Sequence, residues 1–323
     1  GMDDVFVHDR LTGQNVRASV SSAGVEGNGM NTGAAISADG RFVSFTSPAT
    51  NLVPGDNNAK DDVFVRDLPA GTTERVSVSS AGTEGNNPSV VNAISGDGRY
   101  VVFQSTASNL VAGDTNGAGD IFVRDRRAGT TVRVSVSAAG AQGNDVSYSP
   151  VISANGRYVA FESLSTNLVL GDTNATRDIF VRDLQTGAMQ RASVSTAGTQ
   201  GDGPSSLPSL SPDGRYVTFA SSATNLVVGD ANAAADMFVR DTLAGSTRLF
   251  SASVAGVEGN ADSGPRLCMA LTGEYVVFKS SASNLVPGDA NGRWPQGPPT
   301  KTRPCGSPPT FSWPTIPTPT EIS

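Results

Sequence analysis

Several residue types that support chemistry are scarce in this sequence. It contains one histidine, His8, and two cysteines, Cys268 and Cys305, among 323 residues. The cysteines lack both the CxxC spacing and the neighbouring histidines of a metal site, and two cysteines cannot form a disulfide framework. Catalysis by a serine–histidine or cysteine–histidine pair would depend on His8, and no strained nucleophile turn lies near it in the sequence. We therefore expect no nucleophilic catalysis through histidine.

Long apolar runs and excess positive charge are also missing. No segment approaches the roughly 18 consecutive apolar residues that a membrane span requires, so we expect no membrane insertion. Only three of the 23 basic residues are lysines, and 30 acidic residues give a net charge of −7. This charge repels phosphate backbones, which argues against nucleic acid as a partner. The N-terminal residues enter a strand pattern directly, so we expect any secretory leader to be missing from the sequence.

A repeated unit of 58 residues dominates what is present. The block Asp-(Ile/Val/Met)-Phe-Val-(Arg/His)-Asp begins at Asp4, Asp62, Asp120, Asp178 and Asp236, and consecutive starts differ by 58. A second block, Ser-x-Asp-Gly-Arg-aromatic-Val-x-Phe, has its glycine at Gly40, Gly98, Gly156, Gly214 and, more loosely, Gly273. A fixed period of this length is typical of propellers and solenoids.

Each unit reads as four short antiparallel strands. Apolar residues alternate with polar ones, and Gly, Asn and Asp interrupt the runs. In the third unit we predict strands at 149–153, 157–164, 178–184 and 188–195, with turns at 154–156 and 185–187. Four such strands make one propeller blade.

The two repeated blocks resemble the bacterial TolB-like propeller repeat, also called the WD40-like PD40 repeat. Ser211-Pro212-Asp213-Gly214-Arg215-Tyr216-Val217-Thr218-Phe219 is similar to the first part of that repeat, and Asp178-Ile179-Phe180-Val181-Arg182-Asp183 to the second. The resemblance covers residues 4 to about 290 and implies an all-β propeller. The loops, blade count and tail depart from the family, so its role in an envelope complex does not transfer with the fold.

The ends of the repeat region predict how the ring closes. The chain opens with a third and fourth strand between Asp4 and Val20, and its last copy supplies a first and second strand near 267–281. Pairing these halves gives a five-bladed propeller over residues 1–290 and removes exposed sheet edges. The alternative is a truncated larger ring. Nine prolines fall within residues 291–323, so this tail is predicted to be a linker or an aberrant C-terminus.

A repeated Asp-x-Asn-x-x-x-Asp loop is the first candidate site. Oxygen ligands at positions one, three and seven suit calcium, whereas Asp and Asn in loops also form Asx turns. Both interpretations remain open. The candidate ligands are Asp56, Asn58 and Asp62; Asp114, Asn116 and Asp120; Asp172, Asn174 and Asp178; Asp230, Asn232 and Asp236; and Asp289 and Asn291, which ring closure would join to Asp4.

A second polar array follows the predicted fourth strand as Gly-x-(Glu/Gln)-Gly-(Asn/Asp). In an up-and-down blade it emerges on the same face as the Asp-x-Asn loop, and long loops on a rigid scaffold are common binding sites. The simpler interpretation is that these residues cap strand ends. The candidate ligand-binding residues are Glu26, Asn28, Glu84, Asn86, Gln142, Asn144, Gln200, Asp202, Glu258 and Asn260.

Paired carboxylates for glycoside hydrolysis are missing from the predicted innermost strands. These strands, at 33–37, 91–95, 149–153, 207–211 and 267–271, contain no Asp, Glu or His. Loop acids such as Asp145, Asp202 and Asp262 leave open an enzyme that acts on polysaccharides. We expect a secreted or periplasmic bacterial binding module that takes a protein or glycan on its long-loop face, with calcium as a candidate cofactor. The alternatives are that enzyme and a structural repeat of a larger surface protein.

Overall fold

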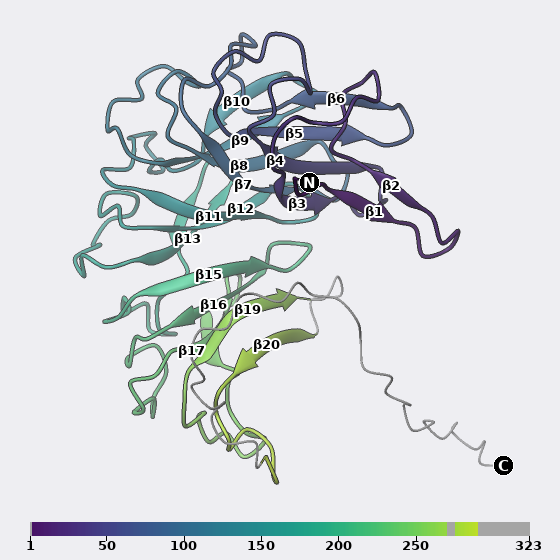
Figure 1. The fold of residues 1–323 in the computed structure, drawn as a ribbon. Helices are drawn as coiled ribbons and strands as arrows, with labels where there is room; N and C mark the ends of the chain where they lie inside the picture. The colour runs from purple at the N-terminus through teal and green to yellow at the C-terminus, as the bar shows by residue number, and fades with distance from the viewer. Residues whose placement is uncertain (1, 270–274, 290–323) are drawn as a thin grey trace, which may run out of the picture. The chain divides into compact units, whose positions relative to one another are not determined.

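The computed structural model describes residues 2–269 and 275–289, which form antiparallel β-sheets without a helix (Figure 1). Accordingly, this part of the chain contains no helix that is able to span a membrane. Four sheets have four strands each. They comprise β3 (Thr32–Ile36), β4 (Phe42–Ser47), β5 (Asp62–Asp67) and β6 (Thr72–Arg75); β7 (Ser89–Ile94), β8 (Tyr100–Ser105), β9 (Asp120–Asp125) and β10 (Thr130–Arg133); β11 (Ser147–Ile152), β12 (Tyr158–Ser163), β13 (Asp178–Asp183) and β14 (Met189–Arg191); and β15 (Ser205–Leu210), β16 (Tyr216–Ser221), β17 (Asp236–Asp241) and β18 (Ser246–Leu249). We call each of these sheets a blade.

Two further sheets have two strands each. β1 (Phe6–His8) pairs with β2 (Asn15–Arg17), and β19 (Ser263–Met269) pairs with β20 (Val276–Ser280), so each end of the repeat region supplies the half-blade predicted for it. Within the described residues the two half-blades are separate sheets. Closure at five blades therefore stays a prediction, and the proline-rich tail from Asn291 lies outside the described residues.

Strand order within every blade follows chain order. Because neighbouring strands are antiparallel, the first strand starts, the second ends, the third starts and the fourth ends at the same end of the blade. The long loops that join the second strand to the third, and one blade to the next, therefore emerge together. We call this the long-loop end. The first strands of successive blades also contact one another, which makes them the innermost strands.

The first strand begins earlier than the alternation pattern predicts. In the third blade the predicted start is Ser149, whereas β11 begins at Ser147. The register between β11 and β12 shifts between Tyr148 and Val151, and Ser149 has a φ of 47°. This β-bulge interrupts the alternation of inward and outward side chains on which the strand prediction depends, so the predicted start is too late.

The hydrophobic core lies between successive blades. Each blade stacks a phenylalanine of its second strand on one of its third, as Phe161 does on Phe180 with ring centroids 6.0 Å apart. Leu168, from the loop between β12 and β13, is 1% exposed and packs in a cluster that also contains Val102 and Ile121 of the preceding blade. The loop leucine thus anchors the long loop to the junction between blades.

Tight turns at the opposite end of the blades use the Asp-Gly-Arg block. At the β15–β16 turn, Ser211 donates its hydroxyl proton to Asp213 at 2.5 Å, and Gly214 has a φ of 76°. A Cβ on Gly214 would lie 2.2 Å from the ring of Tyr158 in the preceding blade. This glycine therefore serves both the turn and the close approach of two blades.

Candidate functional site

The Asp-x-Asn loops form Asx turns. In the first complete blade the Asn58 side-chain oxygen accepts the backbone N–H of Lys60 at 2.8 Å. Its amide nitrogen donates to the Gly85 carbonyl at 2.8 Å and to Asp62 at 3.2 Å. Asn116, Asn174 and Asn232 form the same turn. The asparagine oxygens are therefore bound to backbone in all four copies, as the turn interpretation predicts.

The two aspartates of each loop do come together. The second one begins the third strand, and Asp62, Asp120, Asp178 and Asp236 are all 0% exposed. A serine two residues beyond the end of the fourth strand donates its hydroxyl to one of the aspartate's oxygens, as Ser77 does to Asp62 at 2.5 Å. The Glu or Gln of the second polar array reaches the same place, because an antiparallel bridge such as Val78–Glu84 positions its backbone. The two predicted arrays thus meet at the long-loop end.

An arginine lies between these acids in three blades. Arg75 is 2.6 Å from Glu84 and 3.4 Å from both Asp56 and Asp62. Arg133 lies 3.3 Å from Asp114 and 3.2 Å from Asp120, and in the third blade the distances from Arg191 to Asp172 and Asp178 are 3.0 Å and 3.2 Å. These arginine side chains are only 8–9% exposed. A built-in cation therefore occupies the place where the sequence suggested a metal.

The fourth blade lacks this cation. The position equivalent to Arg75, Arg133 and Arg191 is Leu249, as the 58-residue spacing requires (75, 133, 191, 249). The acids are nevertheless retained, and the residue of the second array is Glu258 rather than the Gln142 and Gln200 of the two preceding copies. The formal charge of the group is −3, against −1 in the second and third blades. Among the described residues, this carboxylate cluster therefore has no arginine between its acids.

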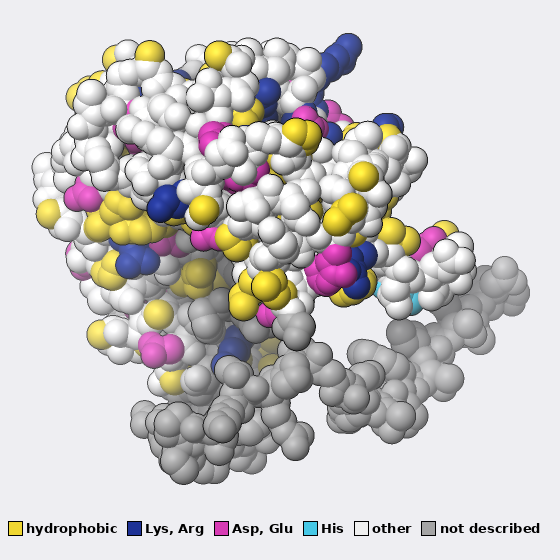
Figure 2. Space-filling model, turned by 45° about the horizontal axis from the view of Figure 1, so that its top comes forward, with side chains coloured by type: hydrophobic (Ala, Val, Ile, Leu, Met, Phe, Trp, Pro, Cys, Tyr) yellow, Lys and Arg dark blue, Asp and Glu magenta, His cyan; other side chains and the backbone are white. Residues whose placement is uncertain are grey.

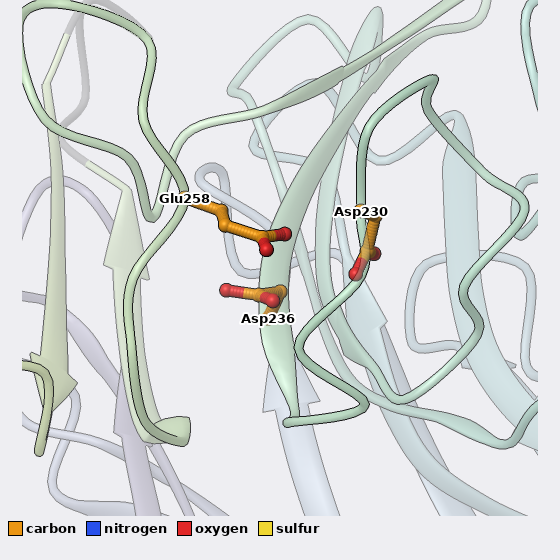
Figure 3. A group of neighbouring side chains, drawn as sticks. All are labelled: Asp230, Asp236 and Glu258. Atoms are coloured by element: carbon orange, nitrogen blue, oxygen red, sulfur yellow. The ribbon is translucent and has the colours of Figure 1, made fainter.

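Asp230, Asp236 and Glu258 converge on a common space (Figure 3). Each offers an oxygen, and these three atoms lie within 4.8 Å of one another. Burial, together with the negative charges of Asp236 and Glu258, raises the pKa of Asp230 to about 6. The pKa of Asp56 is also raised by burial to about 6, but there Arg75 opposes the rise. Three carboxylate oxygens at this spacing suit a hard divalent cation, with backbone oxygens or water completing the shell.

The fifth copy is divided between the two ends of the repeat region. Asp4, which was predicted to complete its loop, lies 3.6 Å from Arg17 and accepts the Ser19 hydroxyl at 2.7 Å. Arg17 also forms an ion pair with Glu26. Asp289 has a partner of its own. Asn291 lies outside the described residues, so the completed fifth loop stays a prediction.

Comparisons with known proteins identify the fold. No family model and no curated protein matches this sequence. Among solved structures the chain is similar to TolB from Acinetobacter baumannii, with 17% identity over 76% of this chain and 47% of that chain and a TM-score of 0.42. It is also similar to oligogalacturonate lyase in complex with manganese, with 11% identity over 90% of this chain and 69% of that chain and a TM-score of 0.53. The chain has a β-propeller fold. It spans about half the length of the Acinetobacter TolB, and identities this low establish the fold alone.

The remaining residues of the second array connect the long loops by hydrogen bonds. The Asn86 side-chain oxygen accepts the backbone N–H of Ser108 at 3.0 Å, and the Asn86 backbone N–H donates to the side-chain oxygen of Asn109 at 2.9 Å. Asn28, Asn144 and Asn260 make the same contacts, and Asp202 bonds the backbone and hydroxyl of Thr224. These side chains are exposed at the long-loop end, and they stabilise its shape.

Acids of the propeller that were considered for catalysis have structural partners. Asp145 accepts the N–H of Val146 at 2.7 Å, and Asp262 that of Ala235 at 3.0 Å. The innermost strands β3, β7, β11, β15 and β19 contain no Asp, Glu or His. His8 lies exposed on β1, 2.9 Å from the side chain of Asn15. The described residues therefore bring no pair of carboxylates together on these innermost strands.

Sequence reasoning missed the arginines, although a signal for them was present. Arg17, Arg75, Arg133 and Arg191 recur at intervals of 58 residues, and Leu249 interrupts the series. The arginine is 19 residues beyond the first aspartate of its loop, as in Asp56 and Arg75, so no local motif includes both. Aligning the copies and asking which charged position is missing from one of them identifies the unbalanced cluster.

Proposed function

We propose that this propeller is a non-enzymatic binding and scaffold module that takes a protein or glycan partner at its long-loop end. A divalent cation, with calcium as the best candidate, binds Asp230, Asp236 and Glu258 and orders the loops of the fourth blade. The observation that carries the proposal is the charge imbalance: three blades hold an arginine among their acids, and the fourth has Leu249 with a full set of carboxylates.

Binding rather than catalysis is supported by the arrangement of the loops. The long connections of every blade emerge at one end and are cross-linked by hydrogen bonds such as that between Asn144 and Thr166. Such a surface is ordered before a partner arrives, so little conformational entropy is lost on binding. The face in Figure 2 shows scattered charges among hydrophobic side chains, polar side chains and backbone, without a large patch of one sign. A partner is then recognised by hydrogen bonds and shape more than by net charge.

The finer architecture belongs to the same proposal. The half-blades β1–β2 and β19–β20 each expose an unpaired strand edge unless they join, and their joining yields five blades. A secreted or periplasmic bacterial location suits a calcium site of this kind, because extracellular calcium modules work at high calcium concentration.

The partner is tested with the intact chain immobilised and exposed to bacterial envelope fractions in calcium or in EDTA. We expect retention of one fraction in calcium, with loss after protease treatment for a protein partner or after periodate for a glycan. Asp230→Asn should weaken that retention, since it removes a cation ligand. Retention of no fraction contradicts the proposal. Release of reducing ends from a retained polysaccharide would establish the alternative enzyme function.

A further inference from the structure

A cavity of about 450 Å³ lies at the long-loop end between the innermost strands β11 and β15. Its lining residues are Tyr148, Ser149, Glu162, Arg177, Ser206 and Leu207. Its volume falls within the range of about 300–1,000 Å³ typical of small-molecule sites. It is separate from the Asp230–Asp236–Glu258 cluster, and none of its lining residues was predicted as a site residue.

A buried carboxylate, paired with an arginine, forms one wall of this cavity. Glu162 is 3% exposed, and its Oε2 accepts a hydrogen bond from Arg177 Nη1 at 3.0 Å. Its Oε1 accepts the backbone N–H of Leu207 at 2.9 Å. Both carboxylate oxygens are therefore held in place: Oε2 by Arg177 of the same blade and Oε1 by Leu207 of the next blade. Each keeps a lone pair available as a further acceptor.

The other wall combines an aromatic ring with hydrogen-bonding groups. The Arg177 guanidinium lies 5.8 Å from the centroid of the Tyr148 ring, and its side chain is 44% exposed. Glu162 is its one ion-pair partner among the described residues. Ser149 and Ser206 line the same space. The cavity thus offers donors, acceptors and an aromatic surface within reach of one ligand.

This combination occurs in one copy of the repeat. Strand pairing makes Tyr148 equivalent to Val90, Thr32 and Ser206, and Glu162 equivalent to Gln104, Thr46 and Ala220. Arg177 immediately precedes its strand, as Asp61, Gly119 and Ala235 do in the other blades. Because the other copies form the same blade without these side chains, the fold does not require them. Their joint presence in one place indicates a ligand.

The charge balance selects the chemical class of that ligand. Glu162 and Arg177 neutralise each other, and the whole chain carries a charge of −7. An anionic ligand would therefore gain little electrostatic attraction in this cavity. A sugar ring presents neighbouring hydroxyls that both donate and accept hydrogen bonds, which suits a guanidinium beside a carboxylate. Its C–H face packs on an aromatic ring. We infer that this cavity binds a neutral saccharide. This inference rests on the proposed binding function and specifies one of its two partner classes.

Ligand titration of the intact chain tests the inference, with saturation-transfer NMR for contact and calorimetry for affinity. The probes are maltose, cellobiose, lactose and chitobiose, with glucuronate as the charged comparison. We expect at least one neutral disaccharide to bind in the millimolar range and more tightly than glucuronate. Binding of none of the four, or tighter binding of glucuronate, would overturn it.

Variants taken from the sister blades separate binding from folding. Tyr148→Val, and Glu162→Ala combined with Arg177→Ala, introduce residues that the second and fourth blades already carry at the equivalent positions, so the blade should fold with an unchanged thermal midpoint. Each should weaken disaccharide binding at least 10-fold. Arg248→Ala, at an exposed position on β18 outside the cavity, serves as the control and should bind as the parent does. Equal binding by all variants contradicts the site.

The two proposals fail in different ways. If the chain retains an envelope fraction in calcium while no disaccharide binds at the cavity, the saccharide inference fails and the binding function stands. If a disaccharide binds and Tyr148→Val abolishes this, while no envelope fraction is retained, the cavity stands and the calcium-dependent partner function fails.

Discussion

Leu249→Arg should place a side-chain cation at the position where the fourth blade is proposed to bind a divalent metal ion. In the sister blades the arginine reaches both aspartates and also donates to a loop carbonyl, from Arg133 to Gly113 at 3.2 Å and from Arg191 to Gly171 at 3.4 Å. Gly229 occupies the equivalent loop position beside Asp230. An arginine at position 249 should therefore find the same three partners, with its aliphatic part in the place of the leucine.

The size of the effect follows from the separation of the charges. Two carboxylates about 5 Å apart repel by about 3 kcal/mol at an effective dielectric constant of about 20. Solvent reduces this value, because Asp230 and Glu258 are partly exposed. We therefore expect Leu249→Arg to raise the free energy of unfolding in EDTA by about 1–2 kcal/mol. This is the scale of a hydrogen bond to a charged group once solvent screening has weakened it.

Calcium should stabilise the parent chain and have little effect on the variant. With a dissociation constant of about 0.1 mM, 10 mM calcium adds about 2.7 kcal/mol to the stability of the folded state. Differential scanning calorimetry at pH 7.5 in calcium and in EDTA measures both quantities. Leu249→Met, which keeps the position neutral, should retain the full calcium response. An equal calcium shift in parent and Leu249→Arg would refute the assignment, as would a lower EDTA midpoint for Leu249→Arg.

Three further outcomes are expected. Arg191→Leu leaves Asp172 and Asp178 buried without their cation and should cost about 3–5 kcal/mol in a denaturant titration, whereas exposed Arg248→Ala should cost less than about 0.5 kcal/mol. Between pH 5 and 7 the EDTA melting midpoint should fall less for Asp230→Asn than for the parent. The reason is that the folded-state pKa of Asp230, about 6, exceeds the unfolded value of about 3.9, so stability is lost as the pH rises through this interval. An identical slope would contradict that reasoning. Gly214→Ala, whose new Cβ would meet the Tyr158 ring, should lower the melting midpoint more than Gly171→Ala does. At Gly171 φ is also positive, but no atom lies within 4 Å of the new Cβ. Equal losses would mean that backbone strain alone, without the contact between blades, causes the destabilisation.

Much of the fold was predictable because its causes are local. The Asp213-Gly214-Arg215 turn depends on one acceptor side chain and one residue with positive φ, both visible in sequence. Every strand end of the third blade except one was predicted to within two residues, because alternation specifies which face is buried. The fourth strand was predicted to reach residue 195 and ends at Arg191. The error at Ser149 arose where a bulge interrupts that alternation.

The candidate site was predictable only in part. The sequence by itself determined the repeat, most of its strands and the set of acids at the loops. The tertiary structure alone decided which charges meet: that Arg133 lies among the acids of its blade, that Leu249 leaves Asp236 without such a partner, and that Tyr148 and Arg177 share a cavity. The physical reason is range. Turn chemistry acts over three or four residues, whereas charge balance and cavities depend on distances that exist only after strands far apart in the chain have paired.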